Sequence, residues 1–165
     1  MMSLFGVLLL LAACFPLDKE EDLRAGLRGI VYLAQTRRFE SKSTCTAAIF
    51  DLASDAVRTP AVRRVSNVRE GIELAKQGRI VAFDVPGLTP NMVSEQMMSI
   101  NLYEGMGLIS SFIGPSMECM DDQFQVDVYY ALMTEDSMAI YDPTSNAMML
   151  LHRPKKLLFY MRGNV

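Results

Sequence analysis

The last thirty residues constrain the fold most, because their apolar residues come in short runs separated by turn-forming sequences. The runs cover residues 138–141, 148–151 and 157–161, and each has the length of a strand. Residues 142–146, Asp-Pro-Thr-Ser-Asn, and residues 153–156, Arg-Pro-Lys-Lys, have the composition of turns. This part of the chain therefore predicts an antiparallel C-terminal β-meander.

Apolar residues at helical spacing predict helices in the preceding part of the chain. Residues 20–38 begin acidic and end basic, which suits the helix dipole, so we expect an amphipathic first helix there. Asn67 followed by Glu70 is typical of an N-terminal cap, and Gly78 stands where a helix end favours glycine. These residues predict a helix over 67–77.

Two more helices are expected in the middle of the chain. Thr89 before Pro90 is an N-cap followed by proline at the first helical position, and we expect that helix to run to about Tyr103. A second stripe at helical spacing comprises Met117, Met120, Phe124, Val128, Ala131 and Leu132. Residues 46–52 are expected to form a strand or a buried turn of helix, and residues 79–85 a strand.

Together these elements predict an α+β domain whose helices pack on one face of a small, mainly antiparallel sheet, with an α/β arrangement as the alternative. Residues 23–165 are expected to form this domain, because their number suffices for one core and is too small for two.

The N-terminal apolar run, residues 4–13, is about half the length of a bilayer-spanning helix and has the length of a signal-peptide core. It ends in Leu11-Ala12-Ala13-Cys14, which resembles the lipobox of bacterial lipoproteins. The resemblance covers residues 1–14 only. It implies that signal peptidase II recognises residues 11–13 and removes residues 1–13, and that Cys14 is acylated, with residues 14–22 as a charged tether.

The resemblance also implies a location. A protein with an acylated Cys14 would sit on a bilayer of the cell envelope and face the periplasm. Phe15 follows the cysteine where some bacteria use Asp to retain lipoproteins in the inner membrane, so the outer membrane is favoured. Residues 1–3 contain no Lys or Arg, which leaves two alternatives open: an uncleaved anchor, or a cytoplasmic protein whose N-terminus packs in the core.

Cysteine usage agrees with export. Once Cys14 is acylated, Cys45 and Cys119 remain, and two thiols in an oxidising compartment are expected to form a disulfide. Two buried free thiols are the alternative. With a single histidine in the chain, these cysteines do not make an ordinary structural zinc site.

Charge is strongly segregated along the chain. Residues 24–79 contain eleven Lys or Arg and five Asp or Glu, whereas residues 80–142 contain ten acidic residues and no Lys or Arg. The opposite charges can complement each other on a solvated surface. They can also form a bipolar surface that turns its basic side to anionic lipid or its acidic side to a basic partner protein. Nucleic acid is not expected as a partner.

Catalytic patterns are scarce. His152 is the single histidine, and neither a nucleophile elbow, a zinc-protease motif nor a phosphate-binding glycine loop accompanies it. A thiol hydrolase that pairs Cys45 or Cys119 with His152 competes directly with the disulfide. We therefore assign no catalytic residue and expect no cofactor.

Two weak metal-binding patterns remain. Glu118, Asp121 and Asp122 cluster near the start of an expected helix, where acidic residues suit the dipole and where a loosely bound calcium or magnesium ion is the alternative. Met117 and Met120 offer thioether ligands for Cu(I), although their spacing also fits core packing.

The sequence thus predicts a lipid-anchored envelope protein that binds or supports another envelope component without catalysis. A periplasmic module that binds a small ligand, or Cu(I) through methionine, is the second hypothesis. An enzyme of unknown class is the third.

Overall fold

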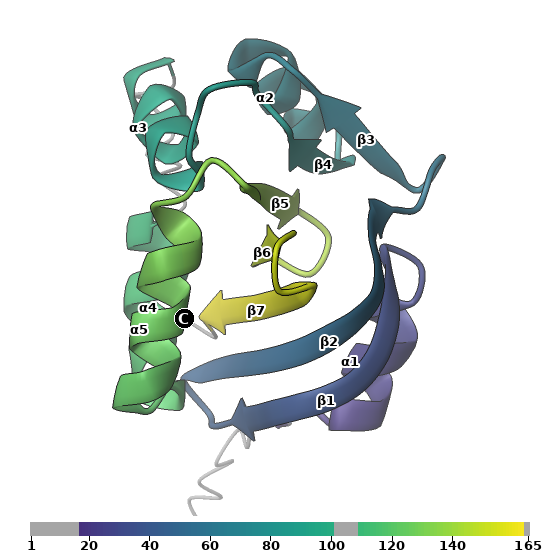
Figure 1. The fold of residues 1–165 in the computed structure, drawn as a ribbon, viewed down its shortest axis with the longest axis vertical. Helices are drawn as coiled ribbons and strands as arrows, with labels where there is room; N and C mark the ends of the chain where they lie inside the picture. The colour runs from purple at the N-terminus through teal and green to yellow at the C-terminus, as the bar shows by residue number, and fades with distance from the viewer. Residues whose placement is uncertain (1–16, 101–108, 164–165) are drawn as a thin grey trace, which may run out of the picture.

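The computed structural model describes residues 17–100 and 109–163, which form an α+β fold around one seven-stranded sheet (Figure 1). The strand order is β1-β2-β7-β6-β5-β4-β3, and only β3 and β4 run parallel. The predicted α+β class is confirmed. The strands are β1 (Val31–Ser41), β2 (Cys45–Val57), β3 (Val62–Val65), β4 (Ile80–Phe83), β5 (Ser137–Asp142), β6 (Ala147–His152) and β7 (Leu157–Gly163). The helices are α1 (Glu20–Leu27), α2 (Val68–Lys76), α3 (Pro90–Ile100), η1 (Ile109–Ile113), α4 (Gly114–Ser116), η2 (Met117–Cys119) and α5 (Asp122–Leu132).

The predicted C-terminal meander is confirmed as β5, β6 and β7, which occupy the centre of the sheet. Every residue of β5 and β6 is buried, as expected of strands covered on both faces. Asn146 and Lys156 have positive φ angles of 48° and 49°, so both turns use the left-handed backbone conformation.

The two faces of the sheet build two separate cores. Side chains alternate along each strand, so Met148 and Leu150 pack towards α2, α3 and α5, whereas Met149 and Leu151 pack on the opposite face. Leu27 of α1 belongs to that second core. Helix α1 therefore covers the opposite face, behind β1 and β2 in Figure 1.

The long first helix expected over residues 20–38 was wrong in its second half. Helix α1 ends at Leu27, and a turn through Gly29 leads directly into β1. Residues 31–38 then pair with β2 through several register shifts. Ile30 and Val31 continued the apolar spacing of the helix because they contribute to the same core as Leu27.

The expected tether also differs from the structure. Residues 20–22 form the first turn of α1. Asp18 accepts a hydrogen bond from Thr46 Oγ1 at 2.6 Å and forms an ion pair with Arg162 at 2.6 Å. The ordered fold therefore includes Asp18, and the charged residues 18–22 do not form a free spacer.

The capping predictions for α2 and α3 are confirmed. Asn67 Oδ1 accepts the Glu70 amide at 3.1 Å, and Gly78 follows α2 with a φ angle of 77°. Thr89 Oγ1 accepts the Met92 amide at 3.2 Å at the start of α3. The expected end of α3 near Tyr103 lies outside the described residues.

Gly71 of α2 is required by the close approach of this helix to β4. A Cβ atom built at position 71 would lie 2.2 Å from the ring of Phe83, which is buried. We expect Gly71→Ala to lower the free energy of unfolding by about 1–3 kcal/mol in a urea titration, because overpacking outweighs the better helix propensity of Ala. Gly26→Ala in α1 is the matched control, since nothing lies within 4 Å of its Cβ position, and it should be neutral or stabilising.

Candidate partner-binding groove between α3 and α5

Helix α5 is fixed on the sheet by its cap and its inner face. Asp121 Oδ1 accepts the Phe124 amide at 2.8 Å, and the Asp121 carboxylate forms an ion pair with Arg38 of β1. The Phe124 ring lies 6.2 Å from the ring of Phe159 in β7. The buried residues Phe124, Val128, Ala131 and Leu132 confirm this part of the predicted stripe.

A disulfide joins Cys45 to Cys119 just before α5, as predicted. Their Sγ atoms are 2.07 Å apart and their Cα atoms 6.1 Å apart. The bridge connects the first residue of β2 to the last residue of η2. It therefore attaches the start of α5 to the end of the sheet.

The outward face of α5 is also apolar. Tyr129 is 64% exposed, and Val126 and Met133 are exposed beside it. These side chains line a groove of about 590 Å³ between α5, α3 and the η1-α4-η2 segment. The lining residues are Asn91, Ile113, Met117, Met120, Gln125, Val126, Val128, Tyr129, Leu132 and Met133.

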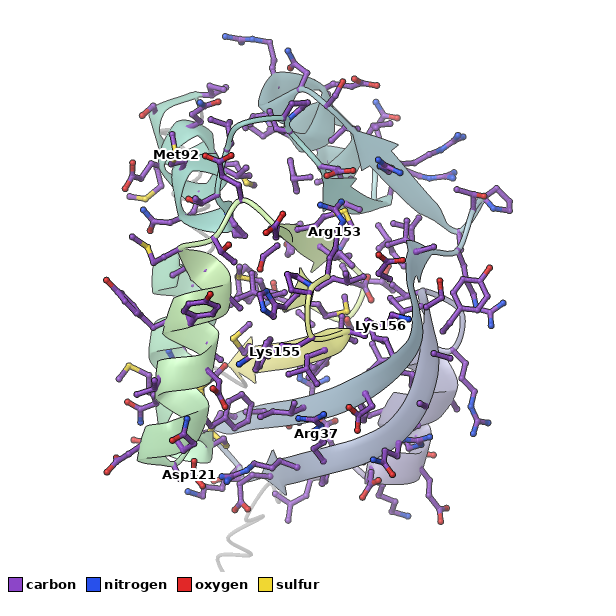
Figure 2. All side chains as sticks on the ribbon, in the orientation of Figure 1. Arg37, Met92, Asp121, Arg153, Lys155 and Lys156 are labelled. Carbon is purple, nitrogen blue, oxygen red and sulfur yellow. A yellow bond between two sulfur atoms is a disulfide. The ribbon has the colours of Figure 1, made fainter. Side chains whose placement is uncertain are left out.

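Helix α3 contributes one residue, Asn91, to the lining of the groove. Its buried face includes Val93 and Met97, so Asn91 and Glu95 lie on an outer face one turn apart. The Asn91 amide donates to Glu95 Oε1 at 2.8 Å. Met92 and Met98 are exposed on the same helix, and Figure 2 shows Met92 on the outer side of α3. Next to the lining residue Asn91, α3 thus presents the exposed thioether side chains of Met92 and Met98 and the Glu95 carboxylate.

The groove region is acidic. Residues 80–152 include all of α3 and α5 and contain no Lys or Arg. Asp122 precedes Val126 by four residues and Tyr129 by seven, so helical spacing places all three on one stripe. Within residues 17–100 and 109–163, no ion pair joins Glu95 or Asp122 to a cation.

The other flank of α5 has the opposite charge. Tyr130 is 58% exposed there, and the Lys155 ammonium lies 5.6 Å from the centre of its ring. Arg37 donates to Asp51 at 2.8 Å, and this hydrogen bond lowers the pKa of the Asp51 carboxyl. Figure 2 shows Arg37, Arg153, Lys155 and Lys156 together on this side. The two flanks of α5 therefore differ in charge, while both present an exposed tyrosine.

His152 lies beneath that basic flank, in the interior. Its Nδ1 atom is 3.0 Å from Ser137 Oγ, and the imidazole packs nearly perpendicular to the Tyr130 ring, with the ring centres 5.7 Å apart. Ser137 is 4% exposed and His152 2% exposed, so substrate cannot reach this pair. The thiol hydrolase alternative is not assembled either, because both Cys45 and Cys119 are held in the disulfide.

Burial lowers the pKa of His152, with a smaller contribution from Lys155, so the folded protein favours the neutral imidazole. An unfolded histidine has a pKa of about 6.5, so below that pH the unfolded state binds more protons. We expect stability to fall as the pH drops from about 7 to about 5. His152→Gln should show a shallower fall in urea titrations over the same pH range.

Two of the candidate metal residues already have protein partners. Asp121 caps α5 and pairs with Arg38, while Glu118 accepts a hydrogen bond from Thr44 at 3.1 Å. In the part of the chain that the structure describes, no group of three His, Cys, Asp or Glu residues could hold a metal ion. Met120 is buried as predicted, but Met117 is exposed, contrary to the expected core stripe, and both line the groove.

Sequence reasoning missed the outward groove residues Val126, Tyr129 and Met133. The available signal was that α5 is apolar around most of its circumference, which in a helix at a protein surface indicates a second buried face or a contact surface. The predicted stripe explained only the inner face.

None of the described helices is both long enough and apolar enough to span a membrane. A scan against family models and searches of curated proteins and of solved structures find no match to this chain.

Proposed function

We propose that the protein is a lipid-anchored component of the bacterial cell envelope that binds another envelope protein and has no catalytic role. The α3-α5 groove is the observation that carries the proposal, because a contiguous group of exposed apolar side chains such as Val126, Tyr129 and Met133 is typical of an interaction site. The lipobox-like residues 11–14 support the envelope location, and a disulfide is typical of oxidising compartments.

The position of Asp18 limits how far the domain can lie from the bilayer. Asp18 contacts Thr46 at the start of β2 and Arg162 near the end of β7. Four residues of extended chain span at most about 14 Å, so an acylated Cys14 would hold this end of the sheet close to the headgroups. The groove begins at the same end, since Asp121 at the start of α5 contacts Arg38 of β1.

Two tyrosines on α5 provide a test with an internal control. Tyr129→Ala removes the most exposed apolar side chain of the groove, whereas Tyr130→Ala removes a similarly exposed ring on the other flank. We expect a partner that copurifies with the wild-type protein from solubilised membranes to be reduced by about tenfold with Tyr129→Ala. Tyr130→Ala should retain it. Equal recovery with both variants would contradict the proposal.

A copper carrier is the second candidate, because the groove brings Met117, Met120 and Met133 to one surface. Thioether sulfur is a suitable ligand for Cu(I). Copper content of the reduced protein after loading and desalting tests this candidate directly. It requires about one equivalent in the wild-type protein and a clear loss in Met117→Leu, which keeps the side-chain volume.

A further inference from the structure

We propose that the groove binds a cationic amphipathic helix of the partner protein. This inference rests on the proposed function, because it names the chemistry of the segment that the α3-α5 groove receives. It follows from three properties of the groove: the hydrogen bonding of the backbone that lines it, the positions of its charged residues, and the apolar side chains that line it.

The walls of the groove favour a helical ligand over a strand. One wall of the groove is α5, whose backbone N–H and C=O groups are used within the helix itself. An extended segment would find no sheet edge to pair with there and would desolvate its own backbone groups against apolar side chains. A helix satisfies its own backbone, so only its side chains need partners.

The spacing of the anchors fits the same geometry. Val126, Tyr129 and Met133 succeed one another at intervals of three and four residues, so they form one line along about two turns of α5. A ligand helix can place apolar side chains at the same interval along this line. Met117 and Met133 add flexible, polarisable contacts that adapt to different partner side chains.

The charge of the groove specifies a cationic ligand. Glu95 accepts a hydrogen bond from the lining residue Asn91, Asp122 lies on the α5 stripe, and neither carboxylate is ion-paired within the described residues. Arg38, which lies at the start of α5, is already paired with Asp121. Lys or Arg flanking the apolar face of a ligand helix would therefore meet carboxylates on both sides.

The same charges disfavour a second copy of this chain as the occupant. A twofold contact through this surface would face Glu95 and Asp122 with the same two residues of the other copy. No Lys or Arg from residues 80–152 would be present to offset the repulsion. A foreign cationic segment forms the complementary contact without this cost.

The absence of tryptophan from this chain provides a clean assay. The probe is a synthetic amphipathic helix of about 18 residues with leucines on one face, lysines on the flanks and a single tryptophan in the apolar face. A matched peptide replaces each lysine by glutamate. Tryptophan emission then reports binding to the full folded domain from the peptide alone.

We expect the lysine peptide to bind at least about tenfold more tightly than the glutamate peptide at low salt, and this preference should shrink near 1 M salt. Tyr129→Ala should weaken binding by about tenfold, and Tyr130→Ala should not. The double variant Glu95→Gln/Asp122→Asn should remove most of the preference for lysine. Asp127→Asn, on the other flank of α5, should preserve it.

Equal affinity for the two peptides, or binding that is insensitive to both Tyr129→Ala and the double variant, overturns the inference. The proposed function is judged separately by the copurified partner. A partner that depends on Tyr129 while the peptides show no charge preference leaves the groove as an interface and rejects the cationic helix. A concentration-dependent dimer that Tyr129→Ala abolishes also rejects it.

Discussion

Reduction of the Cys45–Cys119 disulfide is expected to lower the free energy of unfolding by about 4 kcal/mol. The bridge joins residues 74 positions apart, so its loss restores the freedom of a long loop to the unfolded chain. That amount is a large part of the stability of a typical domain. Urea titration monitored by circular dichroism, with and without reductant, measures the change.

The double variant Cys45→Ala/Cys119→Ala is the control, because its urea midpoint should be low and should not respond to reductant. Both cysteines are buried, so a second measurement checks the bond directly. In denaturant without reductant, a thiol-alkylating reagent should leave positions 45 and 119 unmodified. Complete alkylation of both positions under those conditions would contradict the bridge.

Cys14→Ala is expected to abolish acylation of the protein in its native host. The wild-type protein should begin at Cys14 and carry the mass of its acyl chains. Each buried methylene contributes about 0.8 kcal/mol to membrane binding, so two or more chains make release into water negligible. Intact-mass spectrometry of protein extracted in detergent measures the N-terminus and the added mass together.

Gly71→Ala provides a comparison for this variant, because it perturbs the fold and leaves residues 11–14 unchanged. The Gly71→Ala protein should keep the acyl mass. The Cys14→Ala protein should lack the acyl mass but keep the stability of the wild-type fold. A wild-type protein that retains Met1 as a free N-terminus would contradict the lipoprotein interpretation.

The sequence predicted the meander because its signal is local. Each strand of β5, β6 and β7 is a short apolar run, and each connection has turn chemistry at residues 143–146 or 153–156. The caps at Asn67 and Thr89 were predictable for the same reason, since a cap depends on neighbours within one helical turn.

Residues 31–38 could not be assigned from their pattern. Ile30 and Val31 lie in the core beside Leu27, so the apolar spacing continued across the boundary between α1 and β1. What makes this segment a strand is its pairing with β2, a contact made by residues further along the chain. Tertiary pairing thus overrode a local helical pattern.

The sequence did not predict the groove, because the stripe predicted for α5 covers only the inner face of the helix. Met117 fits the spacing of that stripe, yet η2 interrupts the helix before Asp121 and leaves the Met117 side chain exposed. Whether the outer residues Val126 and Tyr129 are covered depends on how α3 packs beside α5. The spacing of residues within α5 gives no information about that packing.

The proposed function requires that an envelope protein occupies the α3-α5 groove. A photo-crosslinking amino acid placed at position 129 or at position 130, in protein expressed in the native host, tests it in intact membranes. The two positions are adjacent and similarly exposed, but only Tyr129 lines the groove. We expect one defined adduct from position 129 and none from position 130. Adducts of equal yield from both positions, or from position 130 alone, would contradict it.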